Sequence, residues 1–584
     1  MTQFSDYYKR ELRMLRERAA DFASEHPSLA GLLESGSADP DVERLLQGVA
    51  FLAADIRQTV DEDFTEVVHN LAQTICPHHL QPVPSATVVA FEPKANLKQT
   101  HHIPAGTHLE SVPVDGQPCY FRTSFDTAVA PLRLQGADRP DLESETPHPE
   151  GLVQLRLSLN SGDTALSAID LPSLRIHLAG DFGDTSDLYM LLTHFLRRVR
   201  IIDRGGRTLN EFGPDAVRPV GFAPGESLLQ RPGNVLPAYG MLQDYFLFAE
   251  KYLFLEVDLT DWQQRDVGNQ FDLIFECEQP AFNVPSVSRE RFVLHATPAV
   301  NAFDWESEPV VMDHRAEDYP VRPAGEAGRD LVVHSVQAVE GIARGGSGRR
   351  SYQPFSAFLA GRRDQPVYQV GYRRAEAGDD VAVHLSVALP EDEPLRHREV
   401  LKAKLTCTNG ERAEALLPHD IQTPTRDTPE LVTFTNLSAP TPARQPPLDK
   451  SKLWHLISHL SLNYLSIADV ANLQALLRHY AVPGTDERAR DMPNLKRIES
   501  IREVHVKPAE RLMGDRFVRG QSILVRLRSD HFVGYGDRYL FGSILNRFFA
   551  EASAMNTFTA LRFEDTSTGD HIAWPPMLGS RPLI

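Results

Sequence analysis

Large apolar residues recur every three or four positions through the first 25 residues of the chain. They fall at Phe4, Tyr8, Leu12, Leu15, Ala19 and Phe22. This spacing places them on one face of an α-helix, which has about 3.6 residues per turn. An isolated helix of this length is only marginally stable in water, because most helical stability comes from packing of the apolar face. We therefore expect this helix to pack against other helices, and the sequence leaves open which ones.

A second and longer apolar stripe follows. Its start has the marks of a helix N-terminus, because Asp39 can cap the helix, Pro40 suits the first helical position and Asp41 adds negative charge to the first turn. Its apolar residues are Val42, Leu45, Val49, Leu52, Ile56, Val60, Phe64, Val67 and Leu71. The stripe predicts either one helix of about 35 residues that ends at Pro77 or two helices with a break near residues 61–63.

Beyond residue 77 the pattern changes to short β-rich runs separated by Pro, Gly and Asp. Runs at 87–91, 153–159 and 174–178 predict strands, and residues 188–203 predict a helix that leads into a strand. The 584 residues exceed what one hydrophobic core accommodates. We therefore expect a multidomain α+β protein. The expected regions are a helical region at 1–77, a strand-rich α+β domain at 78–280, a second β-rich domain at 281–440 and an α+β domain at 441–584.

Composition argues against several function classes. The formal net charge of −19 would repel a phosphate backbone, and no long basic run with interleaved aromatic residues is present, so nucleic-acid binding is disfavoured. No apolar run is long enough to cross a bilayer, and the first residues lack the apolar core of a secretory signal. The four cysteines form no CxxC pair and no dense disulfide framework. A reducing cytosol is the compartment that fits best.

Two histidine pairs are the most obvious candidates for a metal site. His78 and His79 lie near Cys76, and His101 adjoins His102. Imidazole and thiolate are good zinc ligands, but adjacent side chains diverge in a strand and no second pair follows at zinc-finger spacing. We expect surface or interface histidines rather than a metal site, and we expect no cofactor.

Catalytic signatures are also missing from the sequence. It contains no GxSxG nucleophile elbow, no HExxH zinc helix and no GxGxxG fingerprint after a strand. The Gly-rich segment 341–350 lacks the phosphate-loop pattern, and the glycines of 534–543 are spaced wrongly for a dinucleotide loop, so this second segment is expected to turn the chain into a strand. We therefore expect a protein that is not an enzyme.

Aromatic residues are dense in two further segments. They are Tyr245, Phe246, Phe248, Tyr252 and Phe254 in the first, and Phe548 and Phe549 in the second. Aromatic side chains at this density occur more often in a core than in an interface. We therefore expect both groups to belong mainly to the core.

An ordered series of segments resembles TssF, a baseplate subunit family of the type VI secretion system. The series runs over essentially the whole chain. It comprises YYKRELRMLRERAADFASEHPSLAGLL, DPDVERLLQGVAFLAADI, PHHLQPVPS, YGMLQDYFLFAEKYLFLEV, HATPAVNAF, LTCTNGE, WHLISHLSLNYLSI and YLFGSILNRFFAEASAMNTF. The sequence departs from the family pattern in two minor ways. Gly410 and Glu411 stand where a basic residue is expected, and Cys119 has no counterpart.

The resemblance implies structural work in an injection machine similar to a contractile phage tail. It implies a wedge in which a second TssF copy and one TssG associate with this chain. The wedge would recruit the adaptor TssK and the sheath-initiating TssE around the VgrG spike hub. The assembly would lie in the cytoplasm, at the cytoplasmic face of the inner membrane, where it docks on the membrane complex. The alternative is an undetected enzyme or a secreted effector of the same system.

Three partners remain open for the apolar helix faces. The first helix can fold back on the second within one chain, or both can enter an intermolecular bundle with the second TssF and TssG, as the resemblance implies. Binding to a membrane surface is weaker, because the polar face of the first helix carries as many acids as bases, whereas membrane-surface helices are rich in Lys and Arg. The expected partner-binding residues are Phe4, Tyr8, Leu12, Leu15, Phe22, Leu45, Val49, Leu52 and Ile56.

Overall fold

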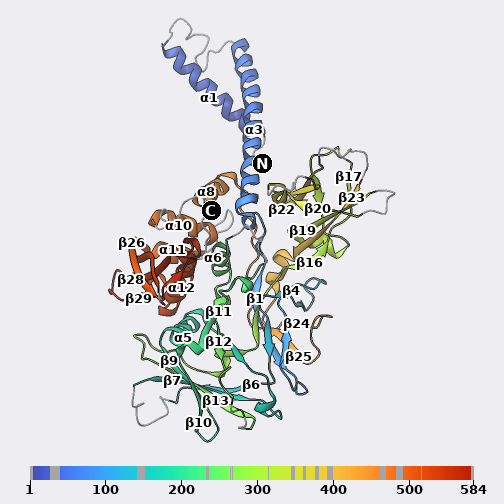
Figure 1. Cartoon of the computed structure of the whole chain (residues 1–584). Coiled ribbons are helices and arrows are strands. Elements are labelled where there is room, and N and C mark those ends of the chain that lie inside the picture. Colours follow the sequence, from blue (N-terminus) through green and yellow to red (C-terminus); the bar gives the residue numbers. More distant parts are fainter. Residues whose placement is uncertain are drawn as a thin grey trace. The chain divides into compact units, whose positions relative to one another are not determined.

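The architecture comes from a computed structural model of the chain (Figure 1). The structure describes residues 4–25, 40–140, 151–229, 231, 236–263, 265, 268–313, 315–343, 349–359, 364–374, 381–390, 399–460, 469–481, 491–514 and 516–579. The chain divides into two compact units. One comprises Met1–Thr74 and Asp449–Trp454, and the other comprises Ile75–Leu448 and His455–Ile584. Helices and many strands are both present, as expected for an α+β multidomain protein.

The first unit is helical. Helix α1 spans Phe4–Glu25 and helix α3 spans Pro40–Ile75, and the unit also includes the first turn of α8 (Lys450–Leu460). α3 runs without interruption for 36 residues, so the prediction of one long helix is confirmed and the alternative break near 61–63 is wrong. The predicted cap Asp39 lies outside the described residues. Figure 1 shows α1 meeting α3 with its N-terminal end.

Strands from distant parts of the sequence form the first sheet of the second unit. Its strand order is β24-β3-β4-β15-β1-β25. The strands are β1 (Ala86–Pro93), β3 (His108–Ser111), β4 (Tyr120–Thr123), β15 (Ala296–Val300), β24 (Ile421–Thr423) and β25 (Val432–Asn436). β1 pairs antiparallel with both neighbours, through Ala86–Ala90 with β15 and through Val89–Pro93 with β25. Beside this sheet, β2 (His101–Ile103) pairs with β5 (Thr127–Val129).

Two further sheets and three helices surround the main core. One sheet has the order β10-β9-β13-β7-β6 and the other β11-β12-β8-β14. The strands are β6 (Arg133–Asp138), β7 (Val153–Asn160), β8 (Ser173–Leu178), β9 (Leu196–Ile202), β10 (Thr208–Phe212), β11 (Val217–Val220), β12 (Phe254–Asp258), β13 (Gln270–Cys277) and β14 (Phe292–Leu294). The helices are α5 (Phe182–His194), α6 (Pro237–Leu247) and α12 (Tyr535–Ala552). The predicted strands at 87–91, 153–159 and 174–178 and the helix-to-strand segment from 188 are confirmed.

The largest sheet has the order β16-β23-β19-β20-β21-β22-β18, and β17 also pairs with β23. Its strands are β16 (Phe303–Glu306), β17 (Val310–Met312), β18 (Tyr319–Val321), β19 (Val332–Ala343), β20 (Arg349–Pro354), β21 (Val367–Arg374), β22 (Val381–Ala388) and β23 (Glu399–Thr408). The short helix α7 (Phe355–Leu359) joins β20 to β21. Most of these pairings are antiparallel, but β20 and β21 run parallel.

The C-terminal sheet has the order β26-β27-β28-β29, with β30 also paired to β28. Its strands are β26 (Ile501–Met513), β27 (Arg516–Leu527), β28 (Phe558–Asp565), β29 (His571–Ala573) and β30 (Met577–Leu578). Helices α10 (Val470–Ala481) and α11 (Met492–Ser500) precede it. Asp469 caps α10, because its carboxylate accepts hydrogen bonds from the amides of Ala471 and Asn472. β27 and β28 are parallel, and α12 makes the crossover that parallel strands require.

One expectation about this region is wrong. Residues 534–543 were expected to turn the chain into a strand, but they begin helix α12 at Tyr535. The two internal glycines of the segment serve close packing rather than a turn. A Cβ at Gly536 would lie 2.0 Å from backbone atoms of Ser186 on α5, and a Cβ at Gly542 would lie 2.1 Å from the Trp574 ring. The glycines therefore let α12 approach its neighbours closely.

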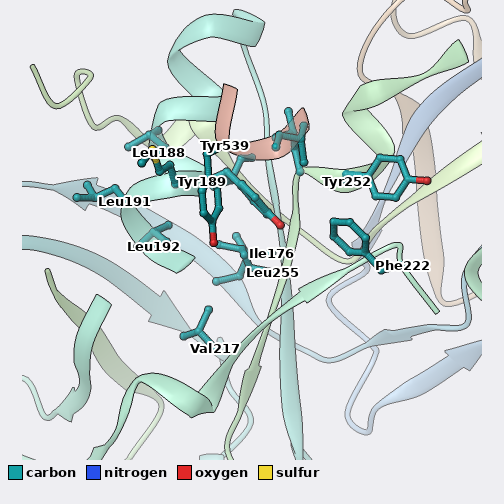
Figure 2. Close-up of a cluster of buried hydrophobic side chains, with 14 of the residues drawn as sticks. Ile176, Leu188, Tyr189, Leu191, Leu192, Val217, Phe222, Tyr252, Leu255 and Tyr539 are labelled. Atoms are coloured by element: carbon teal, nitrogen blue, oxygen red, sulfur yellow. The ribbon is translucent and has the colours of Figure 1, made fainter. Parts of the chain in front are cut away.

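The main core lies where α5, α6 and α12 meet the sheets. Asp181 caps α5 by accepting hydrogen bonds from the amides of Gly183 and Asp184. Figure 2 shows Tyr189 of α5 beside Tyr539 of α12, with Ile176 of β8 and Leu255 of β12 beneath them. Every labelled side chain in this view is buried or nearly so. The sequence forms this core because α5 and α12 are buried around most of their circumference, and apolar residues alternate along strands such as β7.

Candidate assembly interface

The contacts between α1 and α3 include an aromatic pair and two ion pairs. The rings of Phe4 and Phe51 meet edge to face, with their centroids 4.9 Å apart. Arg57 donates a hydrogen bond of 2.8 Å to the buried carboxylate of Glu11. Arg16 pairs with Glu43, and this hydrogen bond holds the pKa of the Glu43 carboxyl below its ordinary value. These contacts determine which side of α3 faces α1.

α3 carries two neighbouring faces of different character. One is lined by small residues and is fully buried, at Ala50, Ala54, Val68 and Ala72. The other carries bulky apolar side chains that are between 39% and 70% exposed. These side chains, the outer apolar face, are Leu45, Val49, Leu52, Ile56, Val60, Phe64, Val67 and Leu71. Because each residue turns a helix by about 100°, residues one apart in sequence, such as Val49 and Ala50, lie on these adjacent faces.

The outer apolar face is unusual for its extent. It runs over about 40 Å of helix at 1.5 Å per residue. Single exposed apolar residues are normal on a protein surface, but a contiguous patch of this kind marks an interaction site. Near its C-terminal end, Phe64 packs on Trp454 of α8, with the ring centroids 5.9 Å apart. The rest of the face has a pattern typical of a helix that enters a bundle.

The residues expected to bind partners differ in their exposure. On α3, Leu45, Val49, Leu52 and Ile56 are all more than half exposed. On α1, Phe4, Tyr8, Leu12 and Leu15 are half-buried and Phe22 is exposed. The intramolecular contact of α1 therefore uses Phe51 and Arg57 rather than the stripe of α3 that the periodicity singled out. Sequence reasoning missed this second face, because alanines give a weak hydrophobic signal.

The aromatic segments lie in the core, as expected. Tyr245, Phe246, Phe248, Tyr252 and Phe254 are each at most 4% exposed, and Phe548 and Phe549 are fully buried. The hydroxyl of Tyr252 donates a hydrogen bond to the carbonyl of Met241. Asp244 between them is buried, and both Arg231 and Lys251 pair with it, at 2.5 Å and 2.6 Å. This segment therefore forms core structure rather than a docking surface.

The expectation that His78 and His79 lie at a surface or interface is wrong. Both are buried, and the His79 ring packs on Tyr480 with centroids 4.6 Å apart. Burial lowers the pKa of His79 to about 3, so both rings are held neutral in an apolar setting. Across the described residues, no three His, Cys, Asp or Glu side chains gather as a metal site would require. None of the described helices is both long and apolar enough to span a bilayer.

Comparison with known proteins decides the family. The family model described as Type VI secretion system, TssF matches residues 1–581. The chain belongs to the TssF family. The type VI secretion system component TssF1 of Pseudomonas aeruginosa is 30% identical to this TssF chain over 631 aligned positions, which cover 99% of each protein.

Two solved structures of type VI secretion baseplate complexes contain chains with a similar fold. One chain from a cryo-electron microscopy structure of a type VI secretion TssK-TssF-TssG baseplate subcomplex matches with a TM-score of 0.74 and 25% identity. The match covers 92% of this chain and 99% of that chain. A chain of a type VI secretion baseplate complex matches with a TM-score of 0.56 and 24% identity over 99% of this chain and all of that one, which shows a shared fold. This member of the TssF family is a structural subunit of the type VI secretion baseplate.

Proposed function

We propose that this TssF chain builds a baseplate wedge with a second TssF copy and TssG, through a helical bundle formed by α1 and α3. The observation that carries the proposal is the outer apolar face of α3. It presents Leu45, Val49, Leu52 and Ile56 to solvent in the chain by itself. Burying a Leu or Ile side chain contributes about 1.5–3 kcal/mol, so covering several of them can hold a stable interface. The related chain with the higher TM-score comes from a solved TssK-TssF-TssG baseplate subcomplex.

We further propose that the wedge recruits TssK and TssE around the VgrG spike hub, in the cytoplasm and docked on the inner-membrane complex. In this role the chain needs no catalytic chemistry and no cofactor. In support, the buried carboxylates Asp244, Glu276 and Asp565 each pair with arginine and so belong to the core.

Charge placed on the outer apolar face tests the bundle. The double variant Leu52→Glu/Ile56→Glu should fold, because both side chains are exposed in the chain alone. It should lose co-purification with TssG, because an unpaired carboxylate buried in an apolar interface costs several kcal/mol. Arg44→Glu is the matched control, since Arg44 is exposed on another side of α3 and its charge changes by a similar step. Leu52→Met/Ile56→Leu should retain TssG.

The same kind of substitution tests the apolar face of α1. Leu12→Glu/Leu15→Glu should also abolish co-purification with TssG and leave most of the chain folded. Wild-type recovery of TssG by both double variants would exclude the bundle. A secreted effector or enzyme is the alternative function, and it predicts a well-behaved monomer when the chain is produced alone. A wedge subunit produced alone should instead be poorly soluble or oligomeric, and co-expression with TssG should rescue it.

A further inference from the structure

A hollow of about 670 Å³ lies in the second unit where β3, β4 and β16 meet the segment after β24. We call it the aromatic groove. It is lined by His108, Glu110, Tyr120, Phe303, Asp304, Trp305, Pro424, Thr425, Arg426 and Asp427. These residues come from two different sheets, because β3 and β4 belong to the sheet that contains β1, and β16 belongs to the largest sheet. The groove has no part in the helical bundle proposed above.

Three aromatic side chains are among the residues that line the groove. The Tyr120 ring lies 5.0 Å from Phe303, edge to face, and 6.4 Å from Trp305. The centroids of Phe303 and Trp305 are 6.1 Å apart, with the ring planes at 79°. Phe303 is buried, whereas Tyr120 and Trp305 are partly exposed. The partly exposed rings of Tyr120 and Trp305 are therefore the ones that a ligand can reach, and aromatic faces attract cations.

Hydrogen bonds hold several lining residues in place. The indole nitrogen of Trp305 donates to the carbonyl of Ala324 at 3.0 Å. The backbone amide of Tyr120 donates to the side chain of Asn409, and the side chain of Asn301 donates to the Tyr120 carbonyl. The hydroxyl of Thr425 donates to the carbonyl of His108 at 2.8 Å and fastens the segment that carries Asp427 to β3. The site is therefore largely preformed, which reduces the entropy cost of binding.

Acidic residues give the groove an excess of negative charge. Glu110, Asp304 and Asp427 line it, against the single guanidinium of Arg426. Arg122 lies behind Asp304 at 3.9 Å and offsets part of its charge, but the Asp304 side chain is still 75% exposed. Glu110 and Tyr120 are paired across the strands, so one carboxylate stands directly beside an aromatic ring. Among the described residues, no arginine or lysine of this chain is recorded over these three rings.

We propose that the aromatic groove binds an arginine side chain of a partner protein. Aromatic faces combined with carboxylates form the environment that a guanidinium prefers, because its plane stacks on rings while its N–H groups pair with carboxylates in a fork. Lysine would lose both the stacking and the fork. A protein occupant suits the exposed rim formed by Asp304, Arg426 and Asp427, since this rim can contact the backbone on either side of the arginine. One part of this inference rests on the proposed function, namely that the bound arginine belongs to a protein.

A titration observed at Trp305 tests the proposal directly. The full-length chain, alone or co-purified with TssG, is labelled with 5-fluorotryptophan, and the Trp305→Phe variant assigns one of the four tryptophan signals of the chain. The probe is the peptide N-acetyl-Gly-Arg-Gly-amide. It should shift the Trp305 signal saturably and leave those of Trp262, Trp454 and Trp574 unchanged. The same peptide with citrulline, which has the same shape without the charge, should bind at least tenfold more weakly, and a lysine peptide should fall between the two.

Variants separate the charge from the rings. Asp304→Asn/Asp427→Asn should weaken the arginine peptide at least tenfold, whereas Glu308→Gln, an exposed acid close by but outside the groove, should leave binding unchanged. Tyr120→Phe should retain binding and Tyr120→Leu should reduce it. Equal binding of the citrulline and arginine peptides, or no saturable shift at Trp305, would overturn the proposal. This readout does not depend on TssG recovery, so failure of the bundle and failure of the groove are distinguishable.

Discussion

Phe64 of α3 and Trp454 of α8 pack against each other with ring centroids 5.9 Å apart and ring planes tilted by 53°. The first unit therefore includes a segment from near residue 450 as well as the N-terminal helices. Because an aromatic pair adds about 0.5–1.5 kcal/mol beyond its buried area, this contact helps to hold the C-terminal half of α3 in place. The contact lies in the C-terminal part of the outer apolar face, and the stretch from Leu45 to Val60 is exposed.

Replacing Trp454 should weaken the packing between α3 and α8 without unfolding the second unit. We expect Trp454→Ala to speed amide hydrogen exchange in residues 64–74 and 449–454, because the ring contact with Phe64 is lost. Trp454→Phe retains a ring and should show a smaller effect. Hydrogen exchange followed by mass spectrometry checks both variants. Unchanged exchange in 64–74 for Trp454→Ala would show that the ring pair does not stabilise α3.

Gly536 should not tolerate a methyl group. A Cβ at this position would lie 2.0 Å from the backbone of Ser186, and backbone atoms cannot rotate away as a side chain can. We expect Gly536→Ala to destabilise the second unit by about 1–3 kcal/mol or more, because α12 must shift away from α5. Gly213→Ala is the matched control, since no atom lies within 4 Å of its Cβ position and its φ of −69° suits alanine. Thermal unfolding should separate the two variants.

Substitution of the buried Asp244 should destabilise the second unit far more than substitution of either of its partners. Although burial opposes its ionisation, the charges of Arg231 and Lys251 hold the pKa of Asp244 below its ordinary value. Asp244→Ala leaves two buried cations without their shared counter-charge, which typically costs about 3–5 kcal/mol. Lys251→Met should cost less, because Arg231 still pairs with Asp244. Urea unfolding measures both variants, and an equal or larger loss for Lys251→Met would contradict this account.

The second unit should lose stability as the pH falls below about 6.5. Burial lowers the pKa of His177 to about 3 and that of His334 to about 4. Below the ordinary histidine pKa the unfolded chain binds protons that the folded chain cannot, so stability present above pH 6.5 is lost toward pH 4. For each such histidine, the free energy of unfolding falls by about 1.4 kcal/mol per pH unit in this range. The difference in unfolding midpoint between pH 7.5 and 5.5 measures the effect.

One substitution isolates the share of a single histidine. His177→Leu removes a buried histidine that packs on Phe254, so it should lower the midpoint at pH 7.5 but reduce the further loss at pH 5.5. His571→Gln changes an exposed histidine on β29 and should leave the pH dependence as it is in the wild type. If His177→Leu showed the same pH dependence as the wild type, protonation of His177 in the unfolded chain would not contribute to the loss of stability at low pH.

Local pattern was sufficient to predict several elements. The 3.6-residue periodicity predicted one long helix or two shorter ones where α3 lies, and short β-rich runs predicted β1, β7 and β8. The dense aromatic residues around Tyr245 and Phe548 were expected in the core and lie there. These features depend on interactions between residues close in sequence, or on burial of very large apolar side chains, so the sequence alone reveals them.

Features set by contacts between distant segments could not be predicted. β1 lies between β15 and β25, and no periodicity indicates which strands pair. Glycines that suggested a turn at 534–543 instead allow α12 to pack on α5. The aromatic groove joins Tyr120 to Phe303 and Trp305, from two sheets. In each case the deciding interaction is tertiary, and a single sequence contains no local signal for it.

By itself, the sequence determined that α1 and α3 are amphipathic helices that need partners, and its likeness over the whole length determined the family. Only the tertiary structure decided which side of α3 is covered within the chain. The face of Ala50 and Ala54 is buried, because small side chains let another element approach the helix axis closely. The bulky side chains of Leu52 and Ile56, on the adjacent face, are left exposed.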